Sequence, residues 1–392
     1  MSSYNRMFFL GIVLILTFFM IINPRETVTS AGKGFELWYS VIVPALLPFF
    51  IAADLLISLG FARFLGVILE PVMRPLFKLP GCSSLVVAIG FTSGFPIGAI
   101  LSRRLYDDKM IEGSEAERLV SFTNNSSPLF ILGAVGVGMF NSPMLGCLLA
   151  VSHYLANLLV GLIWGLTVPT RLPLKKTAPG QLFKEAFKAL AENQAEEKTP
   201  GKLLSDSIKN AINNILAIAG FIIIFSVLTR MLSVWGIMHF VAIFWSKILF
   251  FLNLSYQAAF GIGMGMFEIT IGSQSIAAAV SHDILGQLLA VSMVLAFSGF
   301  SIIAQVMGIV AGMPVRLSFY LKSRLMQMFF SLIITWAGYR LFFENGTAYT
   351  LALPIEKALY SIDAWHISLW CMMVCFIILA MMVIFSLSRN IK

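Results

Sequence analysis

The chain has 392 residues, of which 58% are hydrophobic and 12% are charged, and its mean hydropathy is +0.89. Soluble domains carry about 25% charged residues, so this composition excludes a soluble globular protein and indicates a polytopic membrane protein. The apolar runs have the length of membrane helices and lack the alternation of barrel strands. The net charge of +8 comes from Lys and Arg in short loops, which topology and anionic lipid headgroups explain better than a nucleic-acid partner.

Other sequence features argue against an enzyme. The cysteines and histidines are scattered without the spacing of metal ligands or a redox pair, and the cysteines are interpreted as small core residues. No nucleophile elbow, phosphate loop or zinc motif is present. We therefore predict no catalytic residue, no metal site and no bound cofactor.

About eight transmembrane helices are predicted, so the fold class is an all-α polytopic membrane protein. The first is interpreted as uncleaved, because Asn23-Pro24-Arg25 follows it without a small-residue cleavage signature. Pro44 and Pro48 should bend the second. The predicted spans are Met7–Ile22, Glu36–Leu59, Leu119–Phe140, Met144–Val168, Ala211–Leu232, Gln287–Ala311, Leu325–Phe343 and Ile367–Leu387.

Two segments are predicted to be re-entrant helical hairpins, residues 82–104 and 256–281. The first contains GFTSGFPIG, and a full crossing would place Arg103 and Arg104 on the opposite side from Arg74 and Lys78. A hairpin keeps these charges on one side, and its arms of about ten residues have half-membrane length. The second hairpin contains GMFEITIGSQS. Two of the predicted spans are also broken, at TNNSSP and at SGFS, because Gly and Pro interrupt helices and free backbone groups must then face protein or a cavity.

The remaining segments connect these elements. Phe61–Leu79 and Val234–Leu254 are predicted to lie in the membrane interface, and Asp107–Arg118 is predicted to be a cytoplasmic helix or turn. Residues 171–209 are hydrophilic and rich in Lys and Arg, which predicts a cytoplasmic linker. Within it, Leu182, Phe183, Phe187 and Leu190 have helical spacing, which indicates an amphipathic surface helix. Glu344–His366 is predicted to be an external loop.

The order of elements repeats along the chain. This gives five regions: 1–34 with the first span and an external loop, 35–170 with the first hairpin, the linker 171–209, 210–343 with the second hairpin, and 344–392 with the last span and a cytoplasmic tail. The Lys- and Arg-rich loops 101–118, 171–209 and 313–324 then share the cytoplasmic side with both termini. The two hairpins enter from opposite sides, which is an inverted-topology repeat and favours alternating access.

The break motifs carry a family resemblance. GFTSGFPIGA, EAERLVSFTNNSSPLFILGAVGVGMF, GMFEITIG and LAFSGFSIIAQV resemble the sporulation integral membrane protein YlbJ family, also called SpoVV, from about Phe35 to about Tyr339. Its members carry a Gate, or nucleoside-recognition, domain similar to the concentrative nucleoside transporters. The resemblance implies a transporter-like protein of an endospore-forming bacterium, made in the mother cell, placed in the outer forespore membrane and moving dipicolinic acid. It also leaves a homo-oligomer open.

The substrate site is predicted where the breaks meet. Ser127 should cap a half-helix that begins at Pro128, so that backbone N–H groups face a carboxylate. Phe91, Phe95 or Phe122 could stack on a flat aromatic dianion such as dipicolinate. The alternative for Asn124 and Asn125 is that they only satisfy broken backbone. The predicted substrate-binding residues are Thr92, Ser93, Gly94, Asn124, Asn125, Ser126, Ser127, Glu268, Thr270, Ser298 and Ser301.

Glu268 is the one acidic residue at either hairpin tip, and an ionisable group at membrane depth is a functional candidate. It could carry a coupling proton, coordinate a cation such as Na⁺, or hold the second hairpin through a hydrogen bond. Ser298, Ser301 and Gln305 either complete the site or join helices.

Three functions remain open on the sequence. The first is a carrier of a small anionic solute, with dipicolinic acid as the cargo that the resemblance implies. The second is a non-transporting morphogenetic membrane protein, in which the 171–209 loop would matter most. The third is a carrier of nucleosides or other small solutes, although the first hairpin and first break offer no acidic residue for a ribose hydroxyl.

Overall fold

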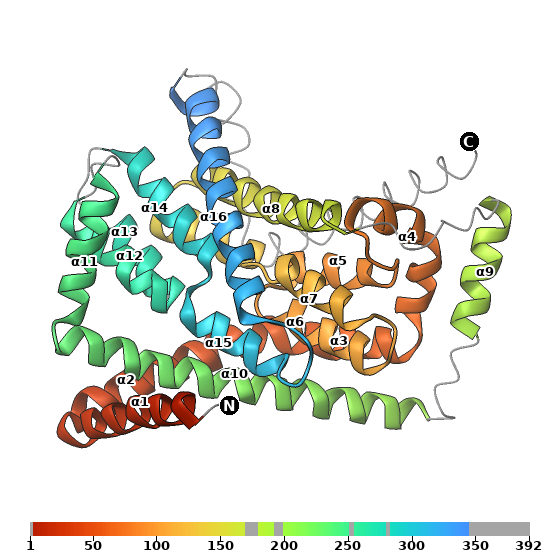
Figure 1. Cartoon of the computed structure of the whole chain (residues 1–392), viewed down its shortest axis with the longest axis horizontal. Coiled ribbons are helices and arrows are strands. Elements are labelled where there is room, and N and C mark those ends of the chain that lie inside the picture. Colours follow the sequence, from red (N-terminus) through yellow and green to blue (C-terminus); the bar gives the residue numbers. More distant parts are fainter. Residues whose placement is uncertain (1–2, 169–178, 192–198, 251–254, 280–282, 345–392) are drawn as a thin grey trace.

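The computed structural model describes residues 3–168, 179–191, 199–250, 255–279 and 283–344 (Figure 1). Within these ranges every regular element is a helix. The prediction of an all-α polytopic membrane protein is confirmed.

The first half of the chain contains two paired elements besides its single helices. The short helices α5 and α6 form one pair, and α7 and the π-helix η2 form the other. The bounds are α1 (Ser3–Ile22), α2 (Pro24–Leu37), η1 (Trp38–Ile42), α3 (Val43–Ser58), α4 (Phe61–Phe77), α5 (Ser83–Ser93), α6 (Ile97–Asp107), α7 (Gly113–Thr123), η2 (Leu129–Met139) and α8 (Pro143–Leu166).

The second half follows the same order after α9 (Pro179–Ala191). Helices α10, α11, the pair α12–α13, the pair α14–α15 and α16 correspond in order to α3, α4, α5–α6, α7–η2 and α8. The inverted orientation of the two repeats stays a prediction. The bounds are α10 (Pro200–Val234), α11 (Ile237–Ile248), α12 (Tyr256–Phe267), α13 (Ile269–Ala277), α14 (Ile284–Phe297), α15 (Gly299–Ile309), α16 (Leu317–Tyr339) and η4 (Arg340–Glu344).

Four helices of the described chain are long and apolar enough to cross a membrane, and up to six are if each of two bent pairs counts as one span. The four occupy 143–166, 200–234, 284–309 and 317–343, where spans are predicted. The first predicted span, Met7–Ile22, falls within the first bent pair, and the second, Glu36–Leu59, overlaps the end of the first pair and the first helix of the second. The predicted span Leu119–Phe140 is divided between α7 and η2, each of 11 residues. The predicted external loop Glu344–His366, apart from its first residue, and the predicted span Ile367–Leu387 lie outside the described residues.

The N-terminal region differs from the expected loop. After α1 the chain bends by 108° and continues as the helix α2. Pro24 stands at the first helical position of α2, where its missing N–H costs no hydrogen bond. Trp38 then donates its indole N–H to the carbonyl of Ile215 on α10 (2.9 Å). Residues 24–34, expected as an external loop, are therefore helical, and the chain beyond them is tied to the second half.

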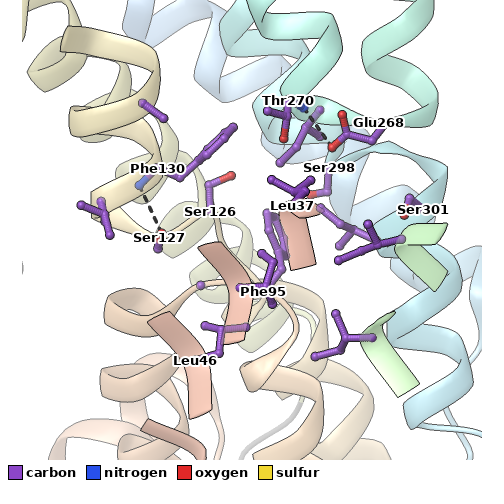
Figure 2. A pocket seen from close by; sticks show the side chains of 18 of the residues that line it. Leu37, Leu46, Phe95, Ser126, Ser127, Phe130, Glu268, Thr270, Ser298 and Ser301 are labelled. Atoms are coloured by element: carbon purple, nitrogen blue, oxygen red, sulfur yellow. Dashed lines mark hydrogen bonds between the residues drawn. The ribbon is translucent and has the colours of Figure 1, made fainter. Parts of the chain in front are cut away.

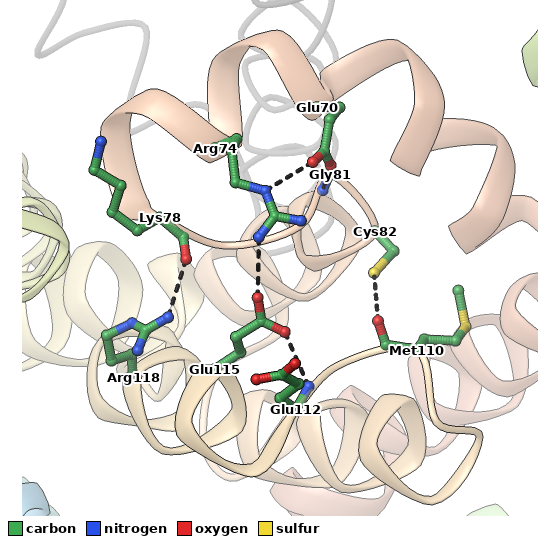
Figure 3. Close-up of polar contacts among 9 residues, drawn as sticks. All are labelled: Glu70, Arg74, Lys78, Gly81, Cys82, Met110, Glu112, Glu115 and Arg118. Carbon is green, nitrogen blue, oxygen red and sulfur yellow. Dashed lines mark hydrogen bonds and ion pairs between the residues drawn. The ribbon is translucent and has the colours of Figure 1, made fainter. Parts of the chain in front are cut away.

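Charged side chains join α4 to α7 (Figure 3). Arg74 pairs with Glu70 on its own helix (2.7 Å) and with Glu115 of α7 (3.0 Å). Arg118 donates to the carbonyl of Lys78 (3.0 Å). Two of the charges that predict an interfacial position for Phe61–Leu79, those of Glu70 and Arg74, are thus used in contacts within the protein, and much of α4 is buried.

The predicted linker is partly helical. The amphipathic helix expected there is α9, which packs on α4 with the rings of Phe187 and Phe64 5.2 Å apart. The next helix, α10, begins at Pro200 and is continuous for 35 residues, so residues 200–209 belong to it. In Figure 1, α10 runs along the longest axis of the molecule.

The two halves share one hydrophobic core. Buried residues of α3, α4, α5 and α8 belong to the same cluster as those of α10, α14, α15 and α16. Helix α8 packs against α16, and α3 packs against α10. The repeats are therefore interleaved, and elements from both can line one cavity.

Candidate functional site

A cavity of about 610 Å³ lies where the two short-helix pairs and the two broken helices meet (Figure 2). Its polar lining comes from four places in the chain: the α5–α6 tip, the α7–η2 break, the α12–α13 tip and the α14–α15 break. The polar side chains are Ser93, Ser126, Ser127, Glu268, Thr270, Ser298, Ser301 and Gln305.

The remaining walls are apolar. Leu37, Ile42 and Leu46 contribute from α2, η1 and α3, and Ile218 and Ile222 contribute from α10. Two aromatic rings also line the cavity, Phe95 at the α5–α6 tip and Phe130 on η2. A cavity of this size, mostly apolar with a few polar groups, has the usual composition of a small-molecule site.

Glycines allow the α5–α6 pair to approach the end of α7. A Cβ atom on Gly98 would lie 2.5 Å from the carbonyl oxygen of Thr123, and a Cβ on Gly90 would clash with the same oxygen. Asn124 strengthens this junction, because its Oδ1 accepts from the N–H of Ala99 in the first turn of α6 (3.0 Å). The first tip is therefore held directly against the first break.

The α7–η2 break has the predicted cap. Ser127 accepts from the N–H of Phe130 through its hydroxyl oxygen (3.2 Å), and the helix begins at Pro128. Ser127 and Leu129 both line the cavity. The N-terminal end of η2, which carries a partial positive charge, therefore lies at the cavity wall.

Side chains of α8 hold the backbone of this break from behind. The N–H of Ser126 donates to Nε2 of His153 (3.2 Å), and the hydroxyl of Tyr154 donates to the carbonyl oxygen of Ser126 (2.8 Å). Nδ2 of Asn157 donates to Oδ1 of Asn125. Both backbone groups of Ser126 are thereby fixed, which sets the direction of its side chain.

Glu268 caps α13 at the second tip. Its carboxylate accepts from the N–H groups of Thr270 (3.1 Å) and Ile271 (2.8 Å), and it also lines the cavity. Of the three roles that the sequence leaves open for Glu268, the structure shows the hydrogen bonds that hold the hairpin. An N-cap of this kind contributes about 1 kcal/mol to helix stability.

Three buried hydroxyl groups in the cavity lining have no hydrogen-bond partner. They belong to Ser93, Ser126 and Ser298, and each of these residues is at most 4% exposed. Ser298 also adopts a left-handed backbone conformation with φ of 75°. This conformation costs a non-glycine residue of order 1–3 kcal/mol, and residues that adopt it cluster at functional sites. Buried polar groups are normally paired, so unpaired hydroxyls on residues that line a cavity are candidates for hydrogen bonds to a ligand.

Comparisons with known proteins identify the family. The Gate model, described as nucleoside recognition, matches residues 39–162. The sporulation integral membrane protein YlbJ of Bacillus subtilis (strain 168) is 42% identical over 331 residues, which cover 83% of this chain and 81% of that protein. The chain belongs to the YlbJ family.

The family assignment agrees with the resemblance that the break motifs carry. A second relative of this YlbJ-family protein is an uncharacterized protein of Alkalihalophilus pseudofirmus, 28% identical over 165 residues that cover 40% of this chain and 34% of that protein. No solved structure matches the chain significantly. The Gate match includes the first tip and the first break and ends before the second pair.

The structure brings eight of the eleven predicted substrate-binding residues of this YlbJ-family protein to one cavity. They are Ser93, Gly94, Ser126, Ser127, Glu268, Thr270, Ser298 and Ser301. That they bind substrate stays a prediction.

The other three predicted residues do not line the cavity. Thr92 donates its hydroxyl to the carbonyl of Ala88 (3.0 Å) within its own helix. Asn124 and Asn125 are fully buried behind the break, where their amides bond to backbone carbonyls and to Asn157. The alternative role for the two asparagines, satisfying broken backbone, is the one that the geometry supports.

Two of the three aromatic candidates are also placed elsewhere. Phe122 stacks on Phe77 with ring centroids 5.2 Å apart, and Phe91 packs against Tyr154. Phe95 remains in the lining. Phe130 was not predicted, although it follows the predicted cap by three positions and could have been placed from that signal.

Sequence reasoning also misses the residues of α8 and α16 that support the break. Arg324, expected in a cytoplasmic loop at 313–324, is fully buried on α16 and donates to the carbonyl of Asn124 (3.1 Å). Gln327 contacts His153 one turn further along. These residues carry no local motif, because their partners lie far away in the sequence.

Proposed function

We propose that this YlbJ-family protein is a membrane carrier for a small organic anion, with dipicolinate as the cargo, and that it works by alternating access. The observation that carries the proposal is one cavity lined by tips and breaks from both repeats. Rocking one repeat against the other would open such a cavity to each side in turn.

The lining suits a flat aromatic carboxylate. The three free hydroxyls and the N-terminal end of η2 offer donors to carboxylate oxygens. Phe95 and Phe130 offer faces on which an aromatic ring can pack. Glu268 is already occupied as a cap, so it need not contact the substrate.

The setting is inferred from the relative. The B. subtilis protein is named for sporulation and for its place in a membrane. We extend both to this chain and assign it to the mother-cell membrane that becomes the outer forespore membrane. The sporulation role and the carrier activity are two separate proposals, and each is tested by its own measurement.

A second candidate is a carrier of nucleosides. It is favoured by the Gate match, whose description is nucleoside recognition, and by the presence of Glu268 and Gln305 in the lining. Competition by a nucleoside against dipicolinate for the purified protein distinguishes the two. Displacement by dicarboxylates alone supports the anion carrier.

The direct test is uptake of dipicolinate into proteoliposomes that contain the purified protein, with H⁺ or Na⁺ gradients imposed in turn. We expect saturable uptake, and Ser126→Ala should lower the affinity at least about tenfold, because a hydrogen bond to a charged group contributes about 1.5–3 kcal/mol. The matched control is Ser273→Ala, since Ser273 is equally buried and its hydroxyl is equally unpaired but lies outside the lining. Absence of uptake under every gradient would contradict the carrier and favour the non-transporting morphogenetic protein.

A further inference from the structure

The cavity lining has an unusual charge distribution for an anion site. Among the described residues that line it, none is Lys, Arg or His, and Glu268 is acidic. The hydroxyls alone do not offset the charge of a dicarboxylate. The N-terminal end of η2 contributes only a partial positive charge, so a full positive charge can come only from residues outside the lining.

Arg324 supplies a buried positive charge behind the wall. It is 0% exposed, and its guanidinium donates to the carbonyl oxygens of Asn124 (3.1 Å) and Ser121 and to Oδ1 of Asn157 (3.1 Å). The guanidinium carbon also lies 5.1 Å from the ring centroid of Tyr320. All of these partners are neutral.

No carboxylate in the described part of the chain pairs with Arg324. The carbonyl end of α7, to which Ser121 and Asn124 belong, carries a partial charge of about −0.5, so about half of the guanidinium charge is left without a counter-charge. An unbalanced charge in the interior is unfavourable unless it is paired, and a nearby anion would relieve this.

The distance to the cavity is short and fixed. Asn124 precedes Ser126 by two residues, which span at most about 7 Å even when fully extended. His153 and Tyr154 hold the backbone of Ser126 in place. At about 15 Å and an effective dielectric constant of about 20, one unit of charge changes affinity about sixfold for each negative charge on the ligand, which is about fortyfold for a dianion.

We propose that Arg324 determines the charge selectivity of the cavity, favouring anions through the electrostatic field of its guanidinium and without touching the ligand. This inference rests on the proposed carrier function and deepens it. Arg324 is a positioning residue as well, because it also holds the end of α7. The test must therefore separate the effect of charge from loss of structure.

The experiment measures binding of two probes to the purified full chain: pyridine-2,6-dicarboxylate and its uncharged diamide. The readout is the affinity for the dicarboxylate divided by the affinity for the diamide. A structural defect weakens the binding of both probes and leaves this ratio unchanged. Arg324→Gln should lower the ratio at least tenfold while binding of the diamide changes little, and Arg324→Lys should retain it.

A second variant removes the net charge with Arg324 in place. Asn157→Asp turns a neutral acceptor of the guanidinium into a carboxylate and also removes the donor to Oδ1 of Asn125; loss of that hydrogen bond weakens the binding of both probes, whereas the charge change should lower their ratio at least tenfold. This variant carries the test if Arg324→Gln does not fold. The matched control is Arg316→Gln, because Arg316 is exposed, is paired with Glu117 and lies outside the cavity; its ratio should equal that of the wild type.

Two results would overturn the inference. If the wild type binds the dicarboxylate and either charge-removing variant keeps the wild-type ratio, Arg324 does not set selectivity, and the proposed carrier function is unaffected. If the wild type binds neither probe, the inference and the proposed cargo both fail.

Discussion

At the scale of single residues, Glu268 shows that an acidic group in a cavity lining can be part of the scaffold. Its two hydrogen bonds to the start of α13 use both carboxylate oxygens. The residue still faces the cavity, so it lowers the local potential for any anion that enters. Glu268 therefore stabilises the fold but lowers the affinity of the cavity for an anion.

Replacement of Glu268 tests this directly. Glu268→Gln keeps one acceptor oxygen, so we expect the protein to lose part of the stability that the cap contributes, and Glu268→Ala should lose all of it, about 1 kcal/mol. The thermal unfolding midpoint of the purified protein is the measurement. Affinity for an anionic probe should rise in Glu268→Gln, because a negative charge has left the lining. Unchanged unfolding in both variants would contradict the capping role.

The same scale shows what sequence can and cannot predict about this site. Ser127 and Pro128 form a local capping signal, and Ser93 and Ser298 stand at Gly-rich breaks, so all of these positions are readable from short motifs. Asn124 looks the same in sequence, but it turns inward because its carbonyl binds Arg324, which lies 200 residues away. A contact at that separation leaves no trace in a single sequence.

At the scale of elements, the paired short helices are close-packed against their neighbours through glycine. Hairpin positions were predictable because Gly and Pro interrupt apolar runs at recognisable places. The lengths of the continuous helices were harder to predict. Helix α10 extends into the predicted linker because residues 200–209 contain good helix formers and begin with Pro200 at the first helical position, a start signal that the linker's charge obscured.

Gly98→Ala should disturb the junction between α6 and α7. The added methyl would lie 2.5 Å from the carbonyl oxygen of Thr123, so the first tip must move away from the first break. We expect a loss of about 1–3 kcal/mol of stability and weaker ligand binding, measured by thermal unfolding and by titration with dipicolinate. The matched control is Gly220→Ala within α10, where no neighbouring atom lies within 4 Å and the helix propensity of Ala favours the change.

At the scale of the whole molecule, an ion pair as well as the core joins the two repeats. Glu117 on α7 accepts from the backbone and the side chain of Arg316, just before α16, with oxygen–nitrogen distances of 2.8 and 2.9 Å. Burial raises the pKa of Glu117, but the hydrogen bonds and the charge of Arg316 lower it more, so the net pKa lies below its ordinary value of 4.5.

This pair predicts a stability that depends on pH. A carboxyl with a lowered pKa stabilises the folded state above its unfolded pKa, and that contribution is lost as pH falls through the folded value. The unfolding midpoint should therefore decrease as the pH is lowered below about 4.5. Glu117→Gln should remove this part of the dependence, and Arg316→Gln should reduce it. A Glu117→Gln protein with the same acid profile as the wild type would show that other carboxyls are responsible.

The continuous helix α10 also connects the cavity wall to a distant part of the molecule. It begins at Pro200, next to the segment that follows α9, and reaches the cavity wall at Ile218 and Ile222. Its 35 residues span about 52 Å, more than the hydrocarbon thickness of a bilayer. A tilt of about 5° centred on Ile218 displaces the Pro200 end by about 2 Å over a lever arm of about 27 Å. If the proposed alternating access tilts α10, a distance probe attached at Pro200, far from the substrate, should detect the displacement.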